Sequence, residues 1–167
     1  HEKIRQSDWN GTVVTTYRPD CVVDPEHHTF KASLAIFGEL TKEDVYSWQG
    51  YLRAHRKKRT EFKALGTTAS DHGHATPRTA NLTPIASEAL FRRILADNVS
   101  SEDAELFRAQ MLTEMARMSL DDGLVMQIHP GSFRNHNPWL FDTYGSDKGA
   151  DIPMRVSYTS ALKPLLE

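Results

Sequence analysis

The chain has 167 residues, of which 39% are hydrophobic and 25% are charged, and its formal net charge is −2. This length is sufficient for one domain with a sizeable core, and the composition is typical of a globular protein. The small net charge excludes an electrostatic case for binding nucleic acid or an anionic membrane. The basic run at residues 55–59 has carboxylates close by in sequence, so we interpret it as a solvated helix face.

The single cysteine, Cys21, excludes an internal disulfide framework and a cysteine-based zinc site. No apolar run approaches the length of a membrane span, and the first residues lack the apolar core of a signal peptide. The sequence starts with histidine rather than methionine. We therefore expect a chain that is processed, tagged or cut from a longer protein.

Helix and strand patterns alternate along the chain, and capping residues set most of the predicted helix starts. The expected elements, in order, are the end of a helix at residues 1–10, a strand at 12–17, a short helix at 30–38, a long helix capped by Thr41 and running to about Lys63, a strand at 64–70, a helix from Thr83 to about Asp97, a long helix from Ser100 or Ser101 to Asp122, a buried strand within 122–137, and a final helix at 158–166. Phe107, Met111, Met115 and Met118 fall on one face of their helix, which favours core packing over a cofactor site.

This order is typical of successive βα units on a parallel sheet, where function sits at the carboxyl ends of the strands. Each predicted strand ends in ionisable residues. The first cluster, at residues 17–20, contains Arg18, whose planar guanidinium suits a carboxylate or a phosphate. The alternative is a structural Arg–Asp pair that closes the loop.

The second cluster contains Asp71, His72, Gly73 and His74, a set that can bind a metal, transfer protons or hydrogen-bond a polyol. Neighbouring residues on a strand point to opposite faces, so at most one of Asp71 and His72 faces a given pocket unless the chain turns there. A hydrogen-bonded loop network is the alternative.

The third cluster begins with His129, which follows an apolar run and can ligate a metal or act as a general base. A core histidine held by a backbone carbonyl is the alternative. The polar residues at 134–137, including Arg134 and Asn137, suit an anionic ligand that is rich in hydroxyl groups.

Several motifs resemble the middle of the uronate (glucuronate) isomerases: RPD at 18–20, ASDHG at 69–73, and GLVMQIHPGSFRNHN at 123–137, with LTEMARMSL at 112–120 and GADIP at 149–153 also fitting. That family belongs to the amidohydrolase superfamily of metal-associated TIM barrels. The resemblance covers essentially the whole chain. It implies an α/β fold in which residues 1–167 form one segment of a (β/α)₈ barrel, with about three parallel strands, roughly barrel strands three to five, and flanking helices.

The resemblance implies the aldose–ketose isomerisation of D-glucuronate to D-fructuronate and of D-galacturonate to D-tagaturonate, in cytoplasmic hexuronate catabolism. Arg18 would pair with the substrate carboxylate, and His129 would be catalytic and lie close to or on the metal. Asp71, His72, Arg134 and Asn137 would line the sugar pocket.

The sequence departs from the family in its metal ligands. The family's His-x-His on the first strand and its aspartate on the eighth have no counterpart, and the pair His72 and His74 lies on the strand-four motif instead. We expect a divalent metal such as zinc in the full-length protein, but no stable metal binding, no isomerase activity and some self-association for this chain alone. A metal-dependent hydrolase on the same barrel, or a non-catalytic sugar-acid binding domain using Arg18 and Arg134, are the alternatives.

Overall fold

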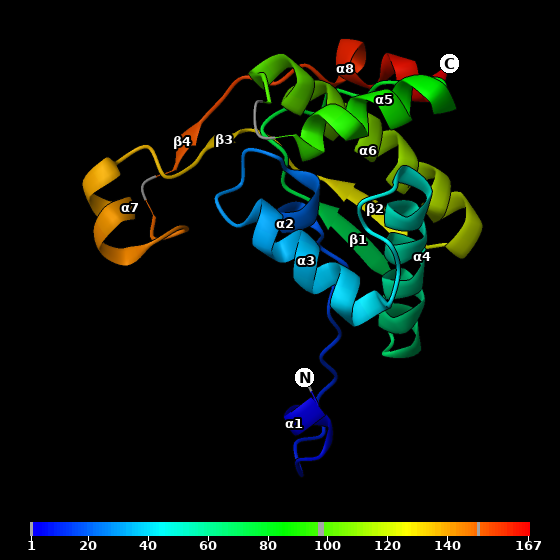
Figure 1. Cartoon of the computed structure of the whole chain (residues 1–167). Helices are drawn as coiled ribbons and strands as arrows, with labels where there is room; N and C mark the ends of the chain where they lie inside the picture. The colour runs from blue at the N-terminus through cyan, green and yellow to red at the C-terminus, as the bar shows by residue number, and fades with distance from the viewer. Residues whose placement is uncertain (1, 97–98, 150) are drawn as a thin grey trace.

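The computed structural model describes residues 2–96, 99–149 and 151–167 (Figure 1). Its helices are α1 (Glu2–Arg5), α2 (Asp20–Val23), α3 (Phe30–Thr41), α4 (Trp48–Ala64), α5 (Pro84–Leu95), α6 (Ser101–Asp122), α7 (Pro138–Tyr144) and α8 (Tyr158–Leu166). Its strands are β1 (Ala69–His72), β2 (Val125–Ile128), β3 (Ser132–Phe133) and β4 (Ile152–Pro153).

The central sheet is parallel. Strands β1 and β2 pair in register from Ala69 opposite Val125 to His72 opposite Ile128. Tyr17 adds a single parallel bridge to β1, with its N–H donating to the Ala69 carbonyl at 3.1 Å. This arrangement, with helices beside it, confirms the predicted parallel α/β fold. The short antiparallel pair of β3 and β4 was not predicted.

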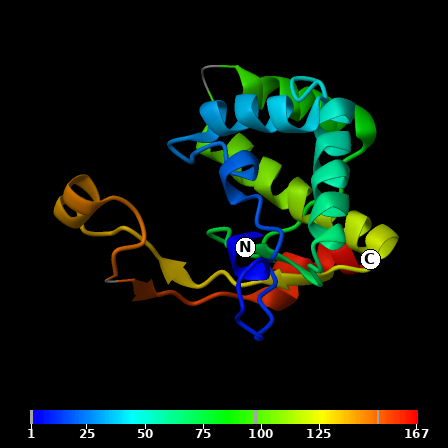
Figure 2. The same cartoon turned by 90° about the horizontal axis from the view of Figure 1, so that it is seen from below.

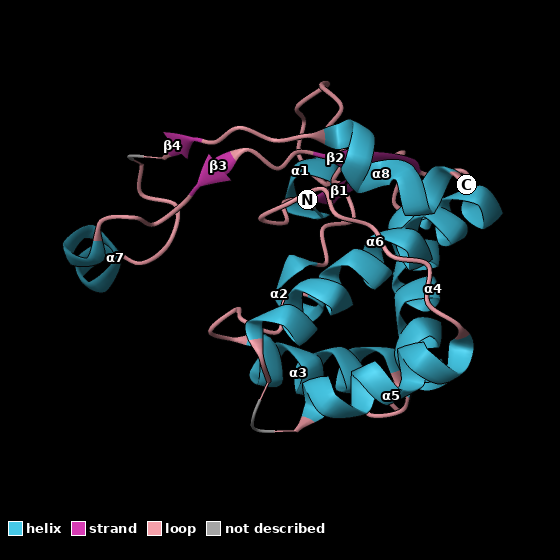
Figure 3. Cartoon of the chain, turned by 90° about the horizontal axis from the view of Figure 1, so that it is seen from above, coloured by secondary structure: helices cyan, strands magenta, loops and turns pink. Residues whose placement is uncertain are grey.

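Helices α2 to α6 gather on one side of the β1–β2 sheet, as Figure 2 shows from below. Figure 3 places α7 at the far end of the β3–β4 ribbon, apart from these helices. Among the described residues, no helix is both long and apolar enough to cross a membrane.

The core lies between the helices and the sheet. The rings of Tyr51 and Phe91 stack at 4.9 Å, and those of Phe91 and Phe107 at 5.7 Å. Met111 and Met115 are fully buried beside them, which confirms that the methionine stripe is core. Burying each such side chain contributes about 1.5–3 kcal/mol, so this cluster is what holds the helices against the sheet.

Local capping signals predicted three helix starts, of which two are confirmed. The side chains of Thr83 and Ser100 accept N–H groups at the starts of α5 and α6. Thr41 does not cap α4: it is the last residue of α3, and its hydroxyl donates to the Phe37 carbonyl at 2.7 Å. Because Lys42 turns left-handed after Thr41, α4 starts later, with Ser47 as its cap.

Three boundary predictions in the first half were wrong. Helix α1 ends at Arg5, well before residue 10. Residues 12–16 are not a strand: among the described residues, the ladder contact of this segment is made by Tyr17 alone, and strand propensity without ladder pairing forms no sheet. The predicted strand at 64–70 starts only at Ala69, after α4 and a turn at Gly66 with φ +94°.

Strand β2 is confirmed but is not buried. Val125 is 64% exposed, and burial alternates along the strand. In the described part of the chain, β2 pairs with β1 alone, so its other edge has no neighbouring strand. The predicted helix end at Asp97 lies outside the described residues; the helix itself ends at Leu95.

Candidate functional site

Three of the predicted site residues meet at the carboxyl ends of the parallel segments. Asp71 is near the end of β1, His129 directly follows β2, and Arg18 directly follows the bridging Tyr17. Parallel pairing brings these ends to one edge of the sheet. Burial alternates along β1, with Asp71 on the partly exposed face, and the His129 side chain is 39% exposed.

Asp71 links the other two side chains. Its Oδ1 lies 2.9 Å from Nε2 of His129, and its Oδ2 lies 3.6 Å from Nε of Arg18. Arg18 makes a shorter contact with Asp20, whose Oδ2 accepts from Nε at 2.8 Å. This hydrogen bond raises the pKa of Arg18, so the guanidinium is charged at all relevant pH values. Negative and positive side chains thus alternate from Asp20 through Arg18 to Asp71, which contacts the exposed imidazole of His129.

Gly73 permits this close assembly. A Cβ at this position would lie 2.7 Å from Nη2 of Arg18 and 3.1 Å from Cε1 of His129. The Gly73 N–H donates to Oδ1 of Asp20 at 3.3 Å, so the backbone itself is one wall of the cluster. A glycine at this point is the feature that lets side chains from three segments approach one another.

A cavity of about 620 Å³ adjoins the cluster, and its wall includes Arg18, Asp20, Gly73, Arg134, Asn135 and Asp147. Arg18 and Gly73 belong both to this wall and to the cluster, whereas Asp71 and His129 are not among the wall residues. The size of the cavity is in the range of small-molecule sites.

Of the two pocket residues predicted after β2, Arg134 lies on the cavity wall and Asn137 does not. Arg134 lines the cavity, and its Nη1 donates to Oδ1 of Asp147 at 3.1 Å. Asn137 caps α7, where its Oδ1 accepts the Leu140 N–H at 3.1 Å, and it is not among the wall residues.

His72 lies on the opposite side of β1 from Asp71, among the helices, and is fully buried. Its Nε2 lies 3.1 Å from Oγ of Ser70, and burial lowers the pKa of His72 to about 3, so the ring is neutral at pH 7. His74 is 6% exposed, and burial lowers its pKa too. The side chains of Asp20, His72 and His74 offer ligand atoms that all lie within 4.8 Å of one another.

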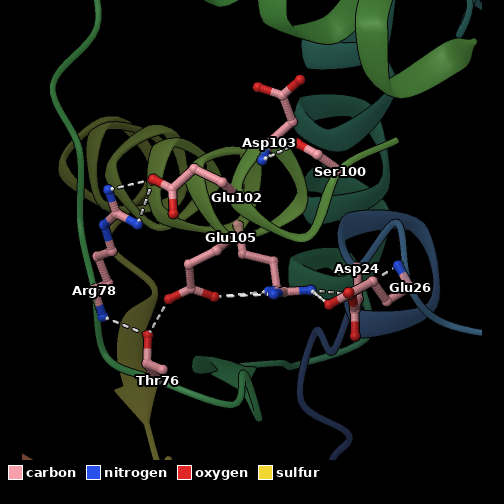
Figure 4. Close-up of polar contacts among 9 residues, drawn as sticks. Asp24, Glu26, Thr76, Arg78, Ser100, Glu102, Asp103 and Glu105 are labelled. Carbon is pink, nitrogen blue, oxygen red and sulfur yellow. Dashed lines mark hydrogen bonds and ion pairs between the residues drawn. The ribbon is translucent and has the colours of Figure 1, made fainter. Parts of the chain in front are cut away.

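Sequence reasoning missed the residue that holds this region to α6. Arg108 has a side chain only 9% exposed, and its Nη1 donates to Asp24 at 2.6 Å and to Glu26 at 2.8 Å. Glu105 completes the group at 2.9 Å from Nη2. Figure 4 shows Asp24, Glu26 and Glu105 converging, and Thr76 and Arg78 beyond them. An arginine within a helical stripe carries no signal for such a long-range contact.

The family model described as glucuronate isomerase matches residues 1–167. The chain is 65% identical over its whole length to a uronate isomerase of Phenylobacterium zucineum and 61% identical to one of Xanthomonas euvesicatoria, covering 35% of each. The crystal structure of glucuronate isomerase from Caulobacter crescentus matches with a TM-score of 0.94 at 57% identity, over 99% of this chain and 34% of that one.

A uronate isomerase structure from Thermotoga maritima has the same fold, with a TM-score of 0.91 at 24% identity over 99% of this chain and 37% of that chain. The chain thus spans about a third of the length of the relatives it matches. With the whole of residues 1–167 matched by the family model, the chain belongs to the glucuronate isomerase family.

Proposed function

We propose that this chain supplies part of the substrate site of a cytoplasmic uronate isomerase that interconverts D-glucuronate with D-fructuronate and D-galacturonate with D-tagaturonate. The observation that carries the proposal is the contact between Asp71 and His129 at 2.9 Å, next to Arg18 and to a cavity of about 620 Å³. Membership of the family supports the same reaction.

His129 is the proposed proton-transfer group. Aldose–ketose isomerisation moves a proton between C1 and C2, and an exposed imidazole suits that task near neutral pH. Asp71 accepts from Nε2 of His129, so Asp71 sets the orientation of the ring. The pair therefore supplies a base whose position is fixed by a carboxylate.

Arg18 is the proposed partner of the sugar carboxylate. Its ion pairs with Asp20 and Asp71 both use Nε. The terminal nitrogens of a guanidinium form a planar fork that binds a carboxylate through two parallel hydrogen bonds. Arg134, from the far wall of the cavity, is proposed to bind hydroxyl oxygens. Asn137 would stabilise that wall as the cap of α7, and His72 would support β1 from behind.

A divalent metal such as zinc would polarise the sugar oxygens in the full-length protein. Beside the cavity-wall residues Arg18 and Gly73, the chain offers Asp71 and His129 as adjacent donors. Catalytic zinc sites use three protein ligands, so we propose that segments outside these residues complete the set. The 167 residues are then expected to be inactive alone.

A chimera tests the proposal. Residues 1–167 would replace the matching third of the Caulobacter crescentus enzyme, and conversion of D-glucuronate and D-galacturonate would be measured beside hydrolysis of simple esters and amides. We expect isomerase activity, and a loss of at least about 100-fold in kcat for His129→Asn. Arg18→Lys should chiefly raise KM for the sugar acid.

Cys21→Ser is a matched control, because Cys21 lies on the cavity wall outside the polar cluster. A folded chimera that hydrolyses esters without isomerising sugars would favour the hydrolase alternative. Full isomerase activity in His129→Asn would refute the assigned role.

A further inference from the structure

The buried side of β1 carries a second cluster, formed by Asp20, His72 and His74. Two imidazoles and one carboxylate offer ligand atoms within 4.8 Å of one another. We propose that these three side chains bind a divalent transition cation, with Zn²⁺ as the best match. A His₂-carboxylate set is a recurrent zinc ligand set in proteins, and its remaining position is taken by water.

The unpaired ring nitrogens are the main argument. Nδ1 of His72 and both ring nitrogens of His74 are buried and have no hydrogen-bond partner among the described residues. The great majority of buried polar atoms are paired, so each such atom calls for an explanation. A cation would use a lone pair on each ring and so satisfy a nitrogen of both residues at once.

Ser70 is placed to hydrogen-bond the ring nitrogen of His72 that does not bind the cation. Its Oγ lies 3.1 Å from Nε2, on the same face of β1. Metal-bound histidines usually have their second ring nitrogen held in this way, which fixes the tautomer and the ring orientation. The Ser70 hydroxyl leaves Nδ1 of His72 as the nitrogen that binds the cation.

The geometry requires only a small contraction. Zinc binds nitrogen and oxygen ligands at about 2.0–2.2 Å, so ligand atoms around one ion lie roughly 3.5 Å apart. Rotation of the His74 and Asp20 side chains would draw the present separations, within 4.8 Å, to that value. The strand fixes His72, and the two other residues lie on flanking segments.

The surrounding charge favours a cation. Asp20, Asp24 and Glu105 all act electrostatically on His74, with Arg108 as the opposing positive charge. Figure 4 shows Asp24, which directly follows α2, and Glu105 of α6 directed toward one another. These three carboxylates outnumber Arg108 around His74, while Arg18 pairs with Asp20 and Arg59 acts on His72. The carboxylates lower the cost of placing a divalent ion in this buried region.

A cation at this site would also affect residues that line the cavity. Asp20 accepts from Nε of Arg18 and from the Gly73 N–H as well as facing the histidines. A cation bound to Asp20 would therefore fix the segment that positions Arg18 and so support the substrate site.

Zinc titration of the 167-residue chain tests the inference, which replaces the expectation from the sequence that this chain alone binds no metal stably. We expect one equivalent of Zn²⁺ to bind by calorimetry and to raise the unfolding temperature, and Co²⁺ to give the visible absorption of a nitrogen- and oxygen-ligated ion. His74→Gln should weaken binding at least about tenfold, and Ser70→Ala by about tenfold, as losses around metal sites do. Circular dichroism checks that each variant is folded.

His28→Gln and His129→Asn are the matched controls, because they remove a histidine from other parts of the chain. Both variants should bind zinc with the affinity of the unsubstituted chain. Zinc binding that survives His74→Gln but is lost in His129→Asn would overturn the proposal and place the ion on the cavity face. Absence of zinc binding to the folded, unsubstituted chain would overturn the proposal as well. Neither result depends on isomerase activity.

Discussion

Asp122 binds the guanidinium of Arg59, which lies 63 residues earlier in the chain. Nε of Arg59 donates to Oδ2 at 2.5 Å, and Nη2 donates to Oδ1 at 2.9 Å, so the two groups meet through parallel hydrogen bonds. The Arg59 side chain is fully buried. The pair ties α4 to the last residue of α6, immediately before β2 begins.

Asp122→Ala should therefore lower the free energy of unfolding by about 3 kcal/mol, because it leaves a buried guanidinium without its carboxylate. The change can be measured by urea denaturation. Asp121→Ala, at an exposed neighbouring carboxylate, should change stability by less than about 0.5 kcal/mol. Equal effects of the two substitutions would show that the buried pair does not stabilise the fold.

The stability of the chain should also fall in mild acid. His55 is buried, its Nδ1 lies 2.6 Å from Oη of Tyr17, and burial lowers the pKa of His55 to about 3. Burial also raises the pKa of Tyr17, so the phenol donates to a neutral ring. Arg59 and Arg56 add positive potential at His55.

The direction of this pH effect follows from the number of protons that the folded and unfolded states bind. Between pH 6.5 and about 3 the unfolded chain protonates His55 and the folded chain does not. The unfolding free energy should thus decrease with falling pH in this window, by roughly 1.4 kcal/mol per pH unit from His55, and the lowered pKa of His72 adds to the fall. His55→Gln, which can still accept from Tyr17, should show a shallower slope in urea denaturation at pH 7, 6 and 5. An unchanged slope would exclude His55 as the cause.

Sequence reasoning succeeded where the signal is local. Thr83 and Ser100 were predicted as caps because a cap is set by its own few neighbours. Thr41 has equally good spacing to Asp44, but the burial of Thr41 at the end of α3 decided against it. The residues at 12–16 have strand propensity, yet a strand also needs a partner, which local sequence does not reveal.

The same distinction applies to the site. Asp71 and His129 were placed together because parallel strands bring their carboxyl ends to one edge, a rule that needs only the order of elements. The approach of Asp20 to His74 depends instead on how α2 folds back against β1, and Arg108 helps to fix that packing. Such contacts are set by tertiary structure and have no local pattern.

Gly73→Ala should disturb the cavity cluster without unfolding the chain. The added methyl group would lie 2.7 Å from Nη2 of Arg18 and 3.0 Å from Oδ2 of Asp20. In the chimera we expect kcat/KM for D-glucuronate to fall by about tenfold, as misplacement of binding groups does. Gly123→Ala is the control: its φ of +77° costs stability, but nothing lies within 4 Å of the new methyl. Equal activity in the two variants would contradict the prediction.

The chain alone should self-associate through β2. In the described residues this strand pairs with β1 on one side, and Val125 is 64% exposed. An open, apolar strand edge is a template for pairing with another copy. We expect light scattering to give a mass that rises with concentration, and Val125→Lys to reduce it, because a charged residue opposes edge pairing. Leu120→Lys, at an 89% exposed position on α6, should leave association unchanged. A mass that stays monomeric at every concentration would refute this prediction.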